Sequence, residues 1–315
     1  FKQKTAYEIM PSLVGSEMCI RDRIHACPLC AQKEFVFVTR ENGLSILRCK
    51  CGLYFVNPQP SEEDLYRFYN DYVTREMAPA WARASLPSFR RDRARITHYV
   101  KRGKLLDIGC GFGFFLKLME DSFYVYGCDL SPAMVDYAKT QLGLKKVVLS
   151  SWKGLSFPEN TFDVITAFYL LTHIKEPDKL IKTAFRWLRP GGLFCLRVPN
   201  LSILKVFWGL KRFDNPLLRR FMYKLRAGTS LSHDPYAVFD PPSFLFHFTP
   251  SVLERFVKKV GFSHLIRFNE GMPKKGGFLN YLTNGLFTQM AEVLKIISHR
   301  KIDICPCFSI YAFKA

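Results

Sequence analysis

The run GKLLDIGCGFGFFLKLM, residues 103–119, constrains the fold most strongly. An apolar strand over residues 104–108 leads into glycines at positions 109, 111 and 113, and a helical stretch follows. Parallel α/β sheets use this strand, glycine turn and helix to bind nucleotides, because glycine lets the backbone approach a ligand closely. A dinucleotide loop would place its third glycine at position 114, where this chain has Phe114. The spacing therefore predicts a nucleotide-type site and argues against NAD.

A second strand follows in YVYGCDLSPAMVDYAK, residues 124–139, and it ends in Asp129. Ser131 is a typical helix N-cap, and Pro132 is suited to the first helical position. Asp129 lies twenty residues beyond Gly109. A carboxylate at the carboxyl end of a strand can accept hydrogen bonds from both hydroxyls of a ribose.

The pattern Asp107-x-Gly109-x-Gly111-x-Gly113 resembles motif I of the class I S-adenosylmethionine (SAM) methyltransferases. The run FPENTFDVITAFYLLTHIKEPDKLIKTAFRWLRPGGLFCLRVPN resembles the fourth strand, the next helix, the LRPGG turn and the fifth strand of that family. FTPSVLERFVKKVGF and the terminal CFSIYAFKA extend the resemblance to Ala315. It implies an α/β fold with a Rossmann-like sheet of seven strands, the last one antiparallel. It also implies an enzyme that carries out SAM-dependent O- or C-methyl transfer.

The resemblance also assigns roles to residues. It implies that Asp107 receives the ammonium group of SAM and that Asp129 holds the ribose. Where relatives have an acid for the adenine amino group, this chain has Ser151 and Trp152; Trp152 either stacks on adenine or covers a strand end. His173 either touches SAM or the acceptor, or is a structural histidine bonded to the backbone. The expected cofactor-binding residues are Asp107, Gly109, Gly111, Gly113, Asp129, Leu130, Ser151, Trp152 and Phe168, and the candidate catalytic residue is His173.

Four cysteines precede this domain, in CPLC (Cys27, Cys30) and RCKC (Cys49, Cys51). Two such pairs at the ends of a hairpin predict a structural zinc site, since Zn²⁺ takes four thiolates in a tetrahedron. The single residue between Cys49 and Cys51 is shorter than usual, so a hairpin that has lost its metal is the alternative. The module resembles the zinc ribbon ending in CGLYFVNPQP that some methyltransferases carry, many of which methylate sugars or other small metabolites.

The first 23 residues look foreign. Translated back into codons, residues 2–9 and 13–22 resemble a flow-cell primer and a transposon-type sequencing adapter, as expected of metagenomic library sequence. We therefore expect residues 1–23 to be an artefact that adds no ordered structure, and the true N-terminus to be missing. A disordered natural leader is the alternative.

Beyond the adapter-like residues 1–23, we expect the chain to have three parts. Residues 24–60 form the zinc-ribbon-like module, and residues 61–103 form a helical connector that opens with a capping box at Ser61 and Asp64. Residues 104–315 form the SAM-binding domain, with a basic and aromatic insert at 200–232. We expect that insert either to cap the sheet or to form a lid over the acceptor pocket. As a lid, it would be able to lie on a membrane surface.

The net charge and the cysteine content of the chain indicate which partners and which location to expect. The net charge is +19, of which the adapter-like segment contributes +1. Such basicity favours a polyanionic neighbour without choosing among RNA, anionic membrane and phosphorylated substrate. Cysteines spaced as ligands favour a reducing, cytoplasmic location. We expect a small-molecule acceptor from a sugar, polysaccharide or natural-product pathway, and this expectation is favoured over a nucleic-acid partner; peripheral contact with a membrane is compatible with it. An RNA methyltransferase and a non-catalytic SAM-binding protein at a membrane surface are the alternatives; the sequence does not predict an oligomeric state.

Overall fold

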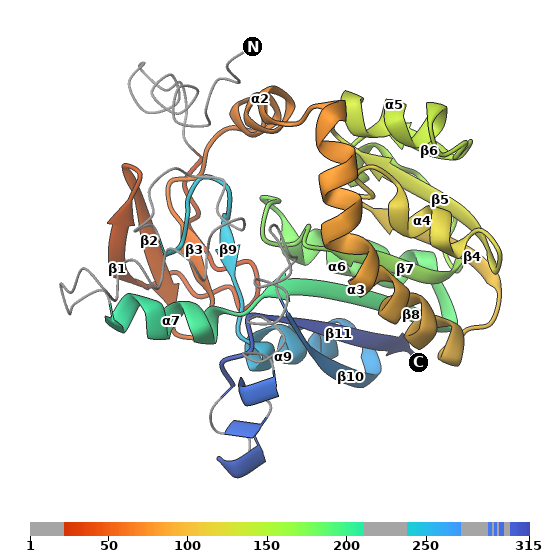
Figure 1. Cartoon of the computed structure of the whole chain (residues 1–315). Helices are drawn as coiled ribbons and strands as arrows, with labels where there is room; N and C mark the ends of the chain where they lie inside the picture. Colours follow the sequence, from red (N-terminus) through yellow and green to blue (C-terminus); the bar gives the residue numbers. More distant parts are fainter. Residues whose placement is uncertain (1–21, 211–237, 272–288, 292, 295, 299–302) are drawn as a thin grey trace.

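A computed structural model describes residues 22–210, 238–271, 289–291, 293–294, 296–298 and 303–315. It contains a seven-stranded sheet and a smaller four-stranded sheet. Figure 1 shows the two sheets side by side, with α3 (Ala78–Tyr99) crossing one face of the larger sheet.

The larger sheet has the strand order β10-β11-β8-β7-β4-β5-β6. Strand β11 runs antiparallel to both of its neighbours, and the remaining contacts among β8, β7, β4, β5 and β6 are parallel. This arrangement confirms the expected Rossmann-like sheet with an antiparallel last strand. Its strands are β4 (Gly103–Ile108), β5 (Phe123–Asp129), β6 (Val147–Leu149), β7 (Phe162–Phe168), β8 (Leu188–Pro199), β10 (Phe262–Glu270) and β11 (Cys307–Lys314).

The central strands are almost continuously buried, as expected of parallel strands covered on both faces. The flanking helices begin at clear sequence signals. Ser131 caps α5 by accepting a hydrogen bond from the Met134 N–H, and Thr249 caps α9 in the same way through Val252. Helices α5, α6 and α9 each have proline in the first turn, where its missing N–H costs nothing. The helices are α4 (Phe114–Met119), α5 (Pro132–Thr140), α6 (Pro177–Trp187) and α9 (Pro250–Val260).

Two helices precede the larger sheet, α2 (Glu62–Tyr72) and α3, with the short η1 (Arg75–Met77) between them. The predicted capping box opens α2: the Asp64 N–H donates to Ser61 Oγ, while the Ser61 N–H donates to the Asp64 carboxylate. Along α3, Trp81 makes an edge contact with Phe112 of the glycine loop. Helix α3 therefore covers the loop that the sequence singles out.

The smaller sheet has the order β1-β2-β3-β9. Three strands come from the cysteine-containing segment, but β9 comes from a point about 190 residues later and pairs with β3. Buried side chains of the hairpin, such as Phe55, belong to the same apolar cluster as Phe194 of the larger sheet. The hairpin is thus packed into the main body. Its strands are β1 (Phe35–Glu41), β2 (Leu44–Cys49), β3 (Tyr54–Val56) and β9 (Phe246–His247).

Two of the expected segments lie partly outside the described residues. The insert predicted at 200–232 begins with α7 (Leu201–Leu210), and residues 211–232 lie outside the described part. Of the adapter-like segment, only residues 22 and 23 are described. The backbone oxygen of Asp22 accepts a hydrogen bond from the Gln59 N–H, and its carboxylate pairs with Lys175. In the part of the chain that is described, no helix has the length and apolarity needed to cross a membrane.

Candidate functional site

The glycine loop and Asp129 meet at the carboxyl edge of the larger sheet. Gly109, Gly111 and Gly113 all have positive φ angles, of 76°, 54° and 80°, which side-chain-bearing residues rarely adopt. The Gly111 N–H donates to Asp129 Oδ2 over 2.8 Å, and the Ser131 N–H donates to Oδ1 over 2.9 Å. Asp129 is therefore fixed across the loop, at the end of β5.

Asp107, in β4, is buried below the same loop. Its Oδ1 accepts a hydrogen bond from Thr166 Oγ1 of β7 over 2.6 Å. Burial raises the pKa of this carboxyl to about 7, with smaller contributions in the same direction from Asp129 and Asp92. Among the described residues no cation forms an ion pair with Asp107. A buried carboxylate in this position suits a cationic ligand, and the ammonium group of SAM is one.

The other expected cofactor residues lie around this edge. Leu130 follows β5 and is partly exposed, and Phe168 ends β7 beside Phe115. Ser151 is the N-cap of the short η2 (Trp152–Gly154), next to the Ser150 N–H that donates to the Asp129 backbone oxygen.

Trp152 lines a pocket of about 430 Å³ together with residues of α6, including Trp187. No residue of the glycine loop lines this pocket. The placement favours Trp152 as a cover over a strand end more than as a partner for adenine.

His173 lies in the turn after β7. Its Nδ1 is hydrogen-bonded to the Ser243 backbone oxygen, and its ring contacts Phe244 at a centroid distance of 4.8 Å. Burial lowers the pKa of His173 to about 4, so the imidazole is neutral at pH 7. With a carbonyl as partner, Nδ1 is the protonated nitrogen of this neutral ring. The backbone bond supports the structural interpretation, and a catalytic role stays a prediction.

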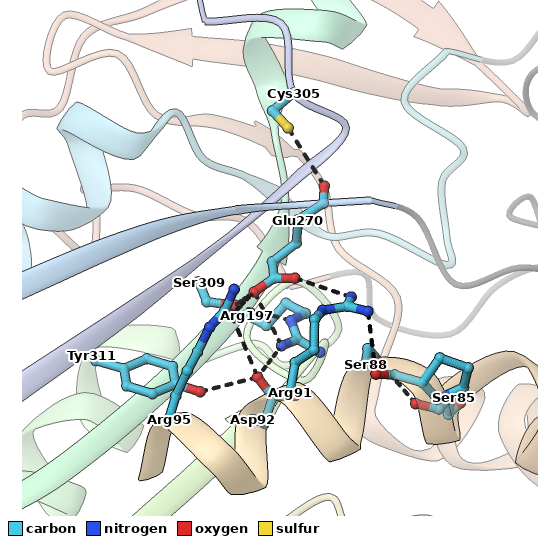
Figure 2. Close-up of polar contacts among 11 residues, drawn as sticks. Ser85, Ser88, Arg91, Asp92, Arg95, Arg197, Glu270, Cys305, Ser309 and Tyr311 are labelled. Carbon is cyan, nitrogen blue, oxygen red and sulfur yellow. Dashed lines mark hydrogen bonds and ion pairs between the residues drawn. The ribbon is translucent and has the colours of Figure 1, made fainter. Parts of the chain in front are cut away.

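A buried network of charged residues lies beneath α3 (Figure 2). The sequence-based predictions did not include it. Arg197 of β8 is fully buried, and its guanidinium donates to Asp92 of α3 and, over 3.0 Å, to Ser309 Oγ of β11. Asp92 also accepts from the Tyr311 hydroxyl over 3.0 Å. The network ties α3 to the sheet strands on which it lies.

Glu270, the last residue of β10, extends this network. It pairs with Arg197, Arg95 and, at 3.6 Å, Arg91. Burial alone would raise the pKa of Glu270, but Arg197 and Arg95 outweigh burial and lower it. The signal that could have revealed the network is Arg197 itself, because a charged residue within a buried apolar strand requires partners.

The four cysteines converge at the end of the small sheet. The Cys27 and Cys51 sulfurs are 3.7 Å apart, the Cys30 and Cys49 sulfurs 3.4 Å, and all four lie within 4.8 Å of one another. Tetrahedral Zn²⁺ with Zn–S bonds of about 2.3 Å places its sulfurs about 3.8 Å apart, so the donor set fits.

A turn compensates for the short spacer in this cluster. Gly52 has a φ of +97°, and its N–H donates to the Cys49 oxygen over 2.9 Å. This glycine turn follows Cys51 directly. The single residue between Cys49 and Cys51 therefore does not keep their sulfurs out of the cluster.

Comparison with known proteins places the chain in a family. A family described as a methyltransferase domain matches residues 106–196. A phosphatidylethanolamine N-methyltransferase of Cereibacter sphaeroides is 30% identical over 141 residues, covering 41% of this chain and 67% of the relative. Phosphoethanolamine N-methyltransferase 1 of Arabidopsis thaliana is 37% identical over 95 residues, which are 28% of this chain and 19% of the relative. The chain thus spans about a fifth of the plant enzyme's length.

A solved structure has the same fold. Phosphoethanolamine N-methyltransferase 2 of Haemonchus contortus, in complex with SAM, aligns with a TM-score of 0.50 at 17% identity. The alignment covers 89% of this chain and 71% of that one. That likeness shows the fold alone. The methyltransferase-domain match over residues 106–196 and the relative that is 30% identical and covered to 67% define the class: the chain belongs to the SAM-dependent methyltransferases.

Proposed function

We propose that this protein transfers the methyl group of SAM to a small-molecule acceptor. The observation that carries the proposal is the meeting of Asp107, the glycine loop and Asp129 at the carboxyl edge of the sheet. In this proposal Asp129 holds the ribose hydroxyls and Asp107 receives the ammonium group. The backbone of Gly109, Gly111 and Gly113 leaves room for the methionine portion.

The surroundings suit methyl transfer. SAM supplies a methyl group on a positively charged sulfur, and this charge disappears as the methyl moves to the acceptor. A dry pocket and an aligned nucleophile therefore supply most of the catalysis. Phe89 of α3, Phe115 and Phe168 pack together as an apolar cluster behind the glycine loop, with ring centroids 5.2 to 6.2 Å apart, and in this proposal the cluster keeps water from the reacting groups.

A base is needed only when the acceptor must lose a proton. His173 is neutral at pH 7, so it can accept a proton, but with a pKa of about 4 it is a weak base. The proposal therefore favours acceptors that attack through a lone pair without first losing a proton. For other acceptors, His173 is the proposed base.

The acceptor class rests on two supports. The cysteine module resembles that of methyltransferases acting on sugars and other small metabolites. The relatives' names describe enzymes acting on phosphoethanolamine and phosphatidylethanolamine, both small molecules. The net charge of +19 is the observation that favours RNA instead. The replacement of the adenine acid by Ser151 favours a protein that binds SAM without catalysis.

We also propose that Cys27, Cys30, Cys49 and Cys51 hold one structural Zn²⁺. Four thiolates leave no open coordination position for substrate, so the metal would stabilise the hairpin and take no part in methyl transfer.

Labelled SAM tests the acceptor class. The protein is incubated with labelled SAM and, in separate reactions, phosphoethanolamine, phosphatidylethanolamine vesicles, nucleotide sugars and bulk RNA. Label is expected in a small-molecule reaction and not in RNA, and Asp129→Ala should abolish it. Label in RNA would overturn the acceptor class while keeping the cofactor. SAM binding with no transfer to any acceptor, including a total metabolite extract, would overturn the catalytic proposal.

A further inference from the structure

The connection between β10 and β11 carries a helix with an exposed apolar face. Residues 289–291, 293–294 and 296–297 are helical, and the Ser298 N–H donates to the Leu294 oxygen. We call the helical residues 289–291, 293–294 and 296–297 the projecting helix, because they extend away from the body below β10 (Figure 1). Ala291 is buried. Five large apolar side chains are exposed by 39% to 72%: Met290, Val293, Leu294, Ile296 and Ile297.

The exposed residues form one face. Met290, Val293, Leu294 and Ile297 follow the spacing i, i+3, i+4, i+7, which places side chains on one side of a helix. Ile296 adjoins them. An apolar face at this spacing normally packs against a core, but here it faces solvent. Contiguous exposed apolar surface of this kind marks an interaction site.

The connection that carries the helix begins and ends at the same edge of the sheet as the glycine loop. Strand β11 is antiparallel to both β10 and β8, so β10 runs parallel to β8 and ends at the carboxyl edge. The root of the connection is fixed there. Cys305 Sγ donates to the Glu270 backbone oxygen, as Figure 2 shows, and Asn200 Nδ2 donates to the Cys305 oxygen over 2.9 Å.

The surrounding sequence is cationic. Residues 272–302 contain one acid, Glu292, and five basic residues: Lys274, Lys275, Lys295, Arg300 and Lys301. The whole chain carries +19. Two copies of this chain meeting through the projecting helix would bring like charges together, whereas an anionic surface would attract them.

We propose that the projecting helix docks on a bilayer that contains anionic lipid. Its apolar face would enter the boundary between headgroups and acyl chains, and the net positive charge of the chain would favour a leaflet with a negative surface potential. Docking through a helix whose connection is rooted at this edge would bring the lipid near the carboxyl ends of the strands. If the proposed function holds, the acceptor site would then open toward membrane-borne acceptors; the docking itself does not depend on that function.

Vesicle co-sedimentation of the full chain tests the proposal without SAM or acceptor. Phosphatidylcholine vesicles are compared with vesicles containing about one third phosphatidylglycerol, at low and high salt. The variant Val293→Asp/Ile297→Asp removes the apolar face. The control Tyr124→Asp changes an equally exposed aromatic side chain, 74% exposed, near the amino end of β5 and thus at the opposite edge. The circular dichroism spectrum and thermal unfolding of each variant check that the main domain is folded.

The wild-type chain should bind the anionic vesicles and lose binding as salt increases. The double variant should bind at least about tenfold more weakly than the wild type, while Tyr124→Asp should bind as the wild type does. Equal binding by the double variant, or a complete lack of binding by the wild type, would overturn the proposal. So would sedimentation equilibrium showing a dimer that the double variant dissociates, because the face would then serve a second copy.

Discussion

Replacing Asp107 with asparagine should stabilise the cofactor-free protein at alkaline pH. Asp107 is buried, its pKa is raised to about 7, and no described cation pairs with it. Asparagine keeps nearly the same shape and still offers an oxygen to Thr166 Oγ1. The substitution therefore removes a buried negative charge without opening a cavity.

The magnitude follows from linkage. The ordinary pKa of the carboxyl is 3.8, and the folded value is about 7. The folded state binds the proton more tightly, so the free energy of unfolding decreases as the pH rises above 3.8 and stops decreasing above about 7. A difference of about three pH units corresponds to at most about 4 kcal/mol. The Asp107→Asn variant lacks this loss. Its free energy of unfolding should therefore exceed that of the wild type, most clearly at pH 8 and least near pH 4.

Urea denaturation of both proteins between pH 4 and pH 8, followed by tryptophan fluorescence, measures the difference. The same substitution should weaken SAM binding, because the proposed ammonium partner is lost. If the wild type and the variant differ by the same free energy at every pH, Asp107 does not titrate as described. A variant that is less stable at pH 8 would refute the reasoning directly.

Two further predictions concern the cysteine cluster and the buried arginine. Purified protein should contain about one zinc ion per chain, and Cys27→Ser/Cys30→Ser should lose it while the control Cys195→Ser retains it; elemental analysis that finds no zinc in freshly prepared protein would contradict the proposed site. Arg197→Met should lower the free energy of unfolding by about 3 to 5 kcal/mol, because the change leaves the fully buried Asp92 without its nearest cation and removes one of the three arginines that pair with Glu270. A loss below about 1 kcal/mol, the scale of an exposed ion pair, would mean that the network does not hold α3 in place.

The sheet and the conformation of its glycine loop could be predicted because local sequence determines them. The glycines at 109, 111 and 113 are needed for backbone angles that other residues rarely adopt, and Ser131 with Pro132 marks a helix start. Long buried strands such as β7 and β8 have runs of apolar residues that are visible without a structure.

The contacts that depend on distant parts of the chain could not be predicted. The pairing of β9 with β3 joins residues about 190 positions apart, and no local pattern specifies it. Arg197 was visible as a charge within an apolar strand, but Asp92 and Glu270 lie on other elements. The direction of Trp152, toward α6, depends on side-chain packing that the sequence does not reveal.

Calorimetric titration of SAM into the wild type and into Asp129→Ala tests the central claim most directly. The wild type should bind one SAM per chain, and Asp129→Ala should bind it about 2 to 4 kcal/mol more weakly, because charge-assisted hydrogen bonds to the ribose are lost. Asp163→Ala is the matched control: this acid accepts a hydrogen bond from the Lys104 N–H at the opposite edge of the sheet, and its loss should leave SAM affinity unchanged. No binding by the wild type, or equal affinity in the wild type and Asp129→Ala, would contradict the assignment of this edge as the SAM site.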